Sequence, residues 1–199
     1  MQCDKKLMKF IDKKTLELDK ILNELDLLVL DFIKILEKHA VYVIVSGYVA
    51  ILLGRTRGTE DIDIFIEALD KGKFSMLYLD LKEKGYWCLN TESVDEMYEY
   101  LQEGSAIRFA RENEIIPNFE VKCAMKARDK EALNDVLLVK TKKGGLRISS
   151  LERQIAFKRY YLKSEKDIED AAHIEEIFKN DIDIKKIEKY KKMLENEKA

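Results

Sequence analysis

The sequence predicts a mixed α/β (α+β) protein with a central sheet of about four or five strands, helices at its N-terminus and a helical segment at its C-terminus. Three observations carry this prediction. The first 39 residues hold apolar side chains at mostly helical spacing, without Gly or Pro; short apolar or alternating runs separated by glycines follow; and from residue 150 the pattern is helical again.

Composition sets the broad class. The chain has 199 residues, of which 46% are hydrophobic and 37% charged, and 36 basic side chains nearly balance 38 acidic ones. This balance argues neither for nor against nucleic acid as a partner. No apolar run reaches the roughly 18 residues of a membrane helix, and the N-terminus lacks the apolar core of a signal peptide. We therefore expect a cytoplasmic protein without a membrane partner; its richness in Lys and Glu is typical of a thermophile.

The elements follow in order. Residues 4–39 are predicted to be helical, with a break near 18–23. The β-branched run VYVIV at 41–45 predicts a buried strand, and YVAILLG returns to helix-compatible residues with Gly54 as the helix end. DIDIFIE at 61–67 alternates with period two, which places Ile62, Ile64 and Ile66 on one face and the aspartates on the other.

The second half continues the alternation of helices and strands. We expect helices that end at Gly85 and Gly104, strands at 86–90, 105–112 and 118–125, then a short helix and a hairpin around Gly144-Gly145. The last segment is helical, with breaks near 164 and 180–183. The expected organisation is an N-terminal helical segment (1–40), a core (41–148) and a C-terminal helical region packed on the core (149–199).

Two carboxylates on one strand carry the first functional signal. Asp61 and Asp63 lie at i and i+2, so both project from one face of the predicted strand. Magnesium prefers such carboxylate oxygens, and a third carboxylate from a neighbouring strand would complete a site for two ions. A solvated strand face is the structural alternative for an Asp-x-Asp pair.

A turn before this strand carries the second signal. Ser46-Gly47 stands where the strand at 41–45 passes into the next helix. Backbone N–H groups at a helix start bind phosphate, and glycine allows close approach. Arg55 and Arg57 in the following loop suit phosphate as well, although a solvated loop explains them too. Trp87 and the pair Tyr160-Tyr161 are candidates for base stacking, with core packing as the alternative.

Taken together, these segments resemble the signature of the DNA polymerase β-like nucleotidyltransferase superfamily, most of all its small prokaryotic and archaeal members such as the AbiEii-type toxins. Ser46-Gly47 falls on the glycine pair of that signature, and Asp61 and Asp63 fall on its metal-binding aspartates. Downstream, SSLERQIAFKRYYLKSEKDIEDAAHI matches the superfamily's last motif. The resemblance covers residues 40–178 and departs from the pattern at Ser46, which replaces a glycine.

The resemblance implies a role for each matched residue. Asp61, Asp63 and Glu120 would be catalytic and hold two Mg²⁺ ions, with Mn²⁺ as a substitute; Glu120 stands where Asp is commoner. Ser46, Gly47, Arg57, Lys158 and Asp167 would bind the nucleotide, with Lys158 on phosphate and Asp170 at a further acidic position of the motif. The fold implied is the nucleotidyltransferase fold.

The implied reaction moves a nucleoside monophosphate from an NTP to an acceptor hydroxyl and releases pyrophosphate. The acceptor is RNA, with tRNA as the first candidate, or a protein side chain, and the toxin-like members imply an antitoxin partner. The oligomeric state is left open. Two alternatives remain: a regulatory or partner-binding protein that keeps the fold with impaired catalysis, and a glycosyltransferase whose Asp-x-Asp holds a sugar nucleotide.

An RNA acceptor would need a basic surface beside the site, because phosphate neutralisation supplies most non-specific affinity. An RNA acceptor is favoured if the basic residues after position 120 converge on one rim of the Asp61–Asp63 cleft. They are Lys122, Lys126, Arg128, Lys130, Lys140, Lys142, Lys143, Lys158, Arg159 and Lys163.

Overall fold

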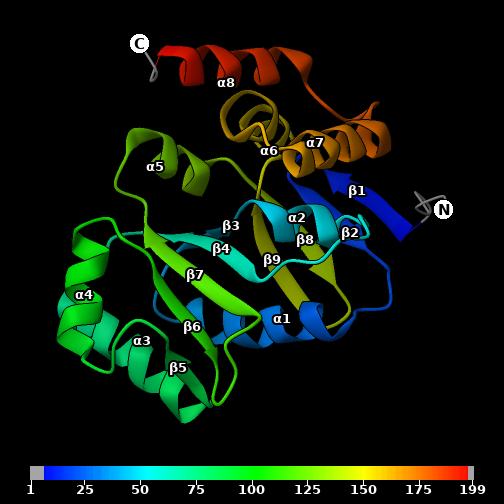
Figure 1. Cartoon of the computed structure of the whole chain (residues 1–199). Helices are drawn as coiled ribbons and strands as arrows, with labels where there is room; N and C mark the ends of the chain where they lie inside the picture. Colours follow the sequence, from blue (N-terminus) through cyan, green and yellow to red (C-terminus); the bar gives the residue numbers. More distant parts are fainter. Residues whose placement is uncertain (1–6, 197–199) are drawn as a thin grey trace.

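A computed structural model of the chain describes residues 7–196 (Figure 1). The expected start of the first helix at residues 4–6 and the last three residues of the C-terminal region lie outside this range. Within it, nine strands form one sheet. The strands are β1 (Met8–Asp12), β2 (Thr15–Leu18), β3 (Tyr42–Ile44), β4 (Asp61–Ile66), β5 (Tyr86–Cys88), β6 (Ile107–Arg111), β7 (Asn118–Cys123), β8 (Val136–Thr141) and β9 (Gly144–Ser149).

The helices connect these strands and form the C-terminal region. They are α1 (Glu24–Leu36), α2 (Gly47–Leu52), α3 (Lys71–Glu83), α4 (Val94–Gln102), α5 (Ala127–Asn134), α6 (Leu151–Ala156), the π-helix η2 (Phe157–Leu162), α7 (Glu165–Phe178) and α8 (Ile184–Asn196). The expected breaks near residues 164 and 180–183 separate η2, α7 and α8. No helix within residues 7–196 is long and apolar enough to cross a bilayer.

The strand order is β1-β2-β8-β9-β3-β4-β7-β6-β5. β3 pairs antiparallel with β4 and parallel with β9, and β4 pairs parallel with β7. The end of β3 therefore lies beside the start of β4, and the N–H of Val45 donates to the carbonyl of Asp63 at 2.9 Å. This pairing brings the turn after β3 next to the two aspartates.

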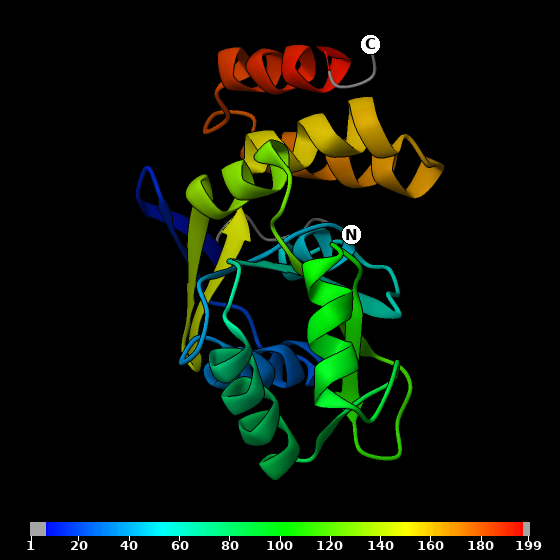
Figure 2. The same ribbon diagram turned by 90° about the vertical axis from the view of Figure 1, so that its left-hand side faces the viewer.

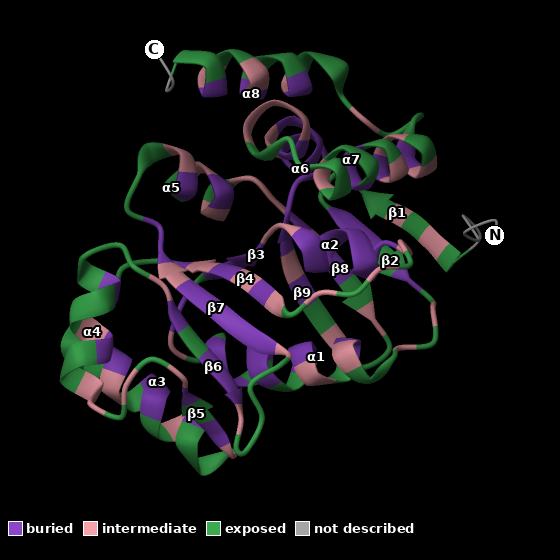
Figure 3. Ribbon diagram, in the orientation of Figure 1, coloured by how far each residue is buried: buried purple, intermediate pink, exposed green. Residues whose placement is uncertain are grey.

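The two faces of the sheet have different coverings. α1 packs on the apolar face, where the ring of Phe32 stacks on Phe119 with centroids 3.8 Å apart. Figures 1 and 2 show α6, α7 and α8 gathered at the opposite end of the molecule from α1 and α3. In Figure 3 the central strands are mostly buried, while the outer sides of α4 and α8 are exposed. The C-terminal helices contribute Ile155, Ile174 and Tyr190 to the same hydrophobic core as the sheet.

The mixed α/β fold is confirmed, but the expected N-terminal helix is wrong over residues 8–18. This segment is the β1–β2 hairpin, and β2 joins the sheet through parallel pairing with β8. Leu16 and Leu18 are fully buried while Glu17 between them is exposed, which is strand periodicity. This hairpin and the expected β8–β9 hairpin extend the sheet beyond the four or five strands predicted.

Candidate functional site

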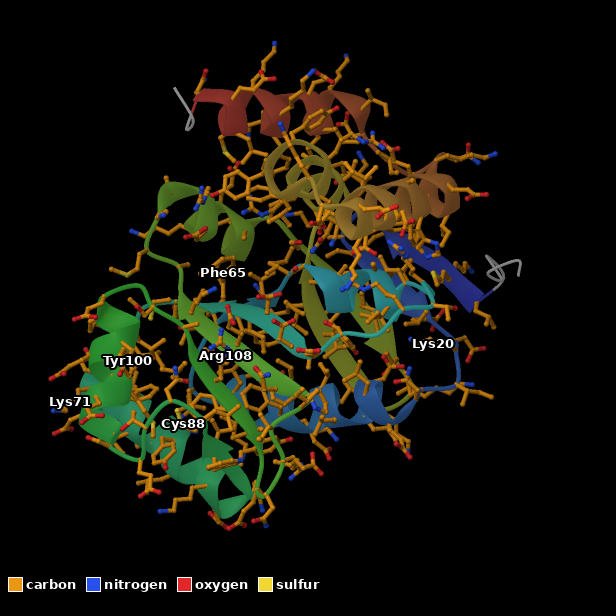
Figure 4. The ribbon with its side chains drawn as sticks, in the orientation of Figure 1. Lys20, Phe65, Lys71, Cys88, Tyr100 and Arg108 are labelled. Atoms are coloured by element: carbon orange, nitrogen blue, oxygen red, sulfur yellow. The ribbon has the colours of Figure 1, made fainter. Side chains whose placement is uncertain are left out.

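Polar side chains from three neighbouring strands form one row on the face of the sheet opposite α1. Asp63 on β4 is in register with Glu120 on β7, which is in register with Arg108 on β6. Residues in register project to the same face, and the isoleucines that alternate with Asp61, Asp63 and Phe65 along β4 are buried on the other face. Figure 4 labels Arg108 of this row. The structure thus brings the sequence-predicted Asp61, Asp63 and Glu120 onto adjacent strands.

Ser46 joins this row from the turn after β3. Its backbone has φ 65° and ψ −137°, a region that favours glycine. Its hydroxyl donates a hydrogen bond to the carboxylate of Asp63. The serine therefore adopts a backbone conformation that favours glycine and adds a side-chain contact to the second aspartate.

Asp63 is the carboxylate of the site whose pKa lies well above its ordinary value. Burial first, and then the negative charges of Asp61 and Glu120, raise its pKa to about 6, while Ser46 and Lys122 act in the opposite direction. Two like charges and partial desolvation destabilise the ionised form. A cation bound among these oxygens would remove that cost.

Glu120 has partners of its own. Its Oε2 accepts hydrogen bonds from Nη2 and Nε of Arg108, at 2.7 and 3.1 Å, and its Oε1 pairs with the ammonium of Lys122. Burial raises the pKa of Glu120, but the bonds from Lys122 and Arg108 outweigh burial and hold it below its usual value. The predicted third acid is therefore ionised and engaged at both oxygens.

Gly47 and Arg57 lie in direct contact. A Cβ on residue 47 would stand 2.6 Å from Nη2 of Arg57 and 3.5 Å from the Thr59 hydroxyl. The guanidinium of Arg57 thus lies against the first turn of α2, where only glycine leaves room for it. Nη1 of Arg57 donates to the buried Asp170 of α7 at 2.8 Å.

Asp170 is the centre of a buried ion cluster. Its side chain is fully buried, and it pairs with Arg57, Arg55 and Lys158. Lys158, from η2, is 1% exposed; its Nζ lies 2.7 Å from Asp170 Oδ2 and 3.3 Å from Asp167 Oδ1. The sequence-predicted Arg57, Lys158 and Asp167 are therefore brought together: Arg57 and Lys158 share Asp170, and Lys158 also pairs with Asp167. π-helical turns recur at functional sites.

A cavity of about 250 Å³ adjoins this cluster and the row of carboxylates. Ser46, Asp63 and Lys158 line it together with Phe65 (labelled in Figure 4) and Tyr161. The Arg128 guanidinium lies over the Tyr161 ring at 4.8 Å. A larger cavity of about 500 Å³ lies between the β1–β2 turn and the start of α8. We take the smaller one as the site because Ser46, Asp63 and Lys158 line it, whereas none of the predicted site residues lines the larger one.

Three features of the site differ from the expectations. Within residues 7–196 no group of three or more His, Cys, Asp or Glu side chains is arranged to hold a metal ion. Trp87 is 39% exposed and its Nε1 donates to the carbonyl of Glu114, so it belongs to the edge of the sheet. The basic residues do not all converge: Lys122, Arg128 and Lys158 line the cavity, whereas the turn with Lys142 and Lys143 lies at the start of β9 and the cavity adjoins the end of that strand at Ser149.

Sequence reasoning missed three residues of this region. Arg108 pairs with Glu120, Asn118 is in register with Asp61, and Arg153 lines the cavity while 3% exposed. The period-two alternation of β6 and β7 placed Arg108 and Asn118 on the polar face, but their neighbours depend on strand order. Arg153 is one charge in a helical pattern, and nothing local marks it as buried.

Comparisons with known proteins address the fold. No protein-family model and no curated protein matches the chain. Among solved structures, an antigenic nucleotidyltransferase-like protein from Paracoccidioides brasiliensis is 18% identical with a TM-score of 0.51, over 76% of this chain and 75% of that one. The solution structure of the antibiotic-resistance factor ANT(2'')-Ia is 19% identical with a TM-score of 0.52, over 87% and 95%. The chain therefore has the fold of nucleotidyltransferase-like proteins.

Proposed function

We propose that this protein is a metal-dependent nucleotidyltransferase that moves a nucleoside monophosphate from an NTP to an acceptor hydroxyl and releases pyrophosphate. One observation carries the proposal. Ser46, Asp63 and Lys158 come from three separate segments that the sequence assigned to one site, and all three line the same cavity. The fold shared with nucleotidyltransferase-like structures supports it.

The donor set fits magnesium. Asp61 and Asp63 offer hard carboxylate oxygens from one strand face, and the pKa of Asp63 is raised by burial and then by the negative charges of Asp61 and Glu120. These two residues would hold Mg²⁺, or Mn²⁺ in its place; the second ion and its ligand Glu120 stay predictions. When bound, the metal neutralises triphosphate oxygens and favours ionisation of the acceptor hydroxyl.

The chain's own cations would position the triphosphate. Asp170 pairs with both Lys158 and Arg57; Lys158 lines the cavity, and Arg57 lies against the first turn of α2 at Gly47. Ser46 and Gly47 would accept the phosphates at that turn, and Asp167 would orient Lys158. Preorganised charges of this kind stabilise the transferring phosphoryl group without reorganisation. Tyr161 would stack on the base.

We propose that the acceptor is RNA, with tRNA as the first candidate, or a protein hydroxyl. The relationship to toxin-type enzymes, and with it an antitoxin partner, remains a prediction from the sequence motif alone. The scattered lysines weaken the case for a long RNA contact. One similar structure is of an antibiotic-resistance factor, so a screen of acceptors includes antibiotics beside RNA and protein.

The test is transfer of label from each α-³²P NTP, with Mg²⁺ or Mn²⁺, to total RNA, protein or antibiotics. We expect transfer by the wild type and none by Asp63→Asn, while Glu67→Gln at the exposed end of β4 keeps full activity as the matched control. Absence of transfer together with absence of metal-dependent thermal stabilisation by NTP would overturn the proposal.

A second candidate rests on Glu120. Because Arg108 and Lys122 engage both of its oxygens, the chain also fits a regulatory protein that binds nucleotide without turning it over. Stabilisation by NTP and metal with no transfer to any acceptor would select this candidate. Turnover of a sugar nucleotide instead of NTP would select the glycosyltransferase alternative.

A further inference from the structure

Asn118 carries a buried oxygen that nothing in the described part of the chain satisfies. The residue is 8% exposed, and its Oδ1 has no hydrogen-bond donor among residues 7–196. Its Nδ2 donates to the carbonyls of Glu60 at 3.2 Å and Ile115 at 3.5 Å. Two carbonyl acceptors fix the orientation of the amide, because a flipped amide would set oxygen against oxygen. Oδ1 is therefore the amide atom that has no hydrogen-bond partner among the described residues.

The position of Asn118 points to what this oxygen binds. It is the register partner of Asp61 on the neighbouring parallel strand, so both side chains project from the same face. The next pair on that face is Asp63 with Glu120. Carboxamide oxygens are ordinary ligands of hard divalent cations. An acceptor without a donor, which lies beside Asp61 and two residues before Glu120 on the same strand face, suits a cation better than an anion.

Glu120 is the competing third ligand, and its contacts argue against it. Arg108 occupies Oε2 and Lys122 occupies Oε1, so a metal ion would have to displace one of these cations to reach either oxygen. Asn118 requires no such exchange. Two carboxylates and a neutral amide also match the charge of one divalent ion.

We propose that Oδ1 of Asn118 is the third protein ligand of the divalent ion held by Asp61 and Asp63, and that Glu120 stays paired with Arg108 and Lys122. This inference rests on the proposed function, because it assumes that the two aspartates bind metal. It assigns to an amide the place that the superfamily pattern gives to a third acid.

The test measures Mn²⁺ affinity of the full chain, by titration followed through the EPR signal of free Mn²⁺. Asn118→Leu keeps the size but removes the oxygen, and we expect at least a tenfold loss of affinity. Asn118→Asp keeps an oxygen at Oδ1 and loses the Nδ2 donor, and we expect affinity equal to or above wild type. Glu120→Gln is expected to stay within twofold.

The aspartate variant separates a ligand from a structural residue. If Asn118 serves only to tie the carbonyls of Glu60 and Ile115, both variants lose that tie and change Mn²⁺ affinity alike, which would overturn the proposal. A tenfold loss in Glu120→Gln would overturn it as well, and this arm holds even if Asn118→Leu does not fold. Thermal unfolding in EDTA checks the folding of each variant.

Asp63→Asn separates the inference from the proposed function. Loss of Mn²⁺ binding in this variant, with wild-type affinity in Asn118→Leu, would defeat the assignment of Asn118 alone. Wild-type affinity in Asp63→Asn would defeat the metal site of the proposed function and the inference with it.

Discussion

Ser46 combines a glycine-like backbone with a side-chain contact at the centre of the site. A non-glycine residue in its region of φ and ψ costs on the order of 1–3 kcal/mol, and the hydroxyl bond to Asp63 accompanies this strain. The backbone strain at residue 46 therefore lowers folding stability, and the same residue supplies a hydroxyl donor to a carboxylate of the site.

Replacing Ser46 tests whether the backbone at this position is strained. We expect Ser46→Gly to raise the free energy of unfolding by about 1 kcal/mol, because glycine adopts this conformation without strain. Ser46→Ala is the control, since it loses the hydroxyl and keeps the strain, and it is expected to give no gain. Urea unfolding in EDTA measures both. Equal stability of the two variants would show that the backbone of residue 46 is not strained.

Buried ion pairs connect separate elements of the fold, most clearly where Asp170 of α7 pairs with Arg55 and Arg57 of the loop before β4. Asp170 is fully buried with three cations around it, while its neighbour Glu169 is 57% exposed and pairs with Arg55. Removal of one partner from a buried ion cluster leaves charge without compensation, whereas exposed pairs contribute little.

The two neighbours on α7 form a matched pair of variants. We expect Asp170→Asn to lower the free energy of unfolding by about 3–5 kcal/mol, because Lys158 is left buried without its main partner. Glu169→Gln is expected to cost about 0–1 kcal/mol. Urea denaturation at pH 7 compares them. Similar losses in both would mean that α7 is attached by its apolar face and not by the cluster.

The junction between β8 and α8 depends on pH. Burial raises the pKa of Asp135, but hydrogen bonds from Lys186, Ser150 and Tyr190 outweigh it and lower the pKa below the ordinary 3.8. A depressed folded pKa contributes stability that is present above the unfolded value and is lost as the pH falls through the folded one.

Asp135→Asn should therefore destabilise the protein by about 2 kcal/mol at neutral pH. The gap to wild type is expected to stay constant from pH 7 to 5 and to shrink below the unfolded pKa of 3.8. Unfolding free energies across this pH range measure it. A gap that grows on acidification would contradict the assigned direction of the shift.

At the scale of the whole molecule, the arrangement of the strands separates the basic residues into two groups. Lys126 and Lys130 belong to the α5 region, which contributes Arg128 and Asp129 to the cavity, whereas Lys142 and Lys143 lie at the far end of β9. Lys142 also pairs with Asp19. RNA bound across the cavity would contact the first group.

Charge reversal distinguishes the two groups. For single-stranded RNA we expect Lys126→Glu with Lys130→Glu to reduce the slope of log affinity against log salt by about 1 or more, since about 0.7 is lost for each phosphate contact. Lys142→Glu with Lys143→Glu should leave the slope unchanged. A fluorescence anisotropy titration at several salt concentrations measures it. A larger effect at residues 142 and 143 would place RNA at the other end of the sheet.

Local periodicity determined the central part of this protein. The alternation of residues 61–67 fixed which side chains of β4 face the core, and the Ser-Gly turn with its flanking segments fixed where a helix begins. These features depend on a few neighbouring residues, so the sequence alone predicted β3, α2, β4 and the positions of Ser46, Asp61 and Asp63. The misassigned hairpin at 8–18 shows the limit, because its alternation is short and its burial comes from pairing with the distant β8.

Only the tertiary structure decided what surrounds those residues. The register of β4 with β7 sets Asn118 beside Asp61 and Glu120 beside Asp63, and the position of β6 brings Arg108 to Glu120. Likewise, the packing of α7 gives Arg57 and Lys158 a shared carboxylate. Which way a side chain points is a property of its own strand, whereas its neighbours across the sheet depend on how separate segments of the chain pair and pack around one core.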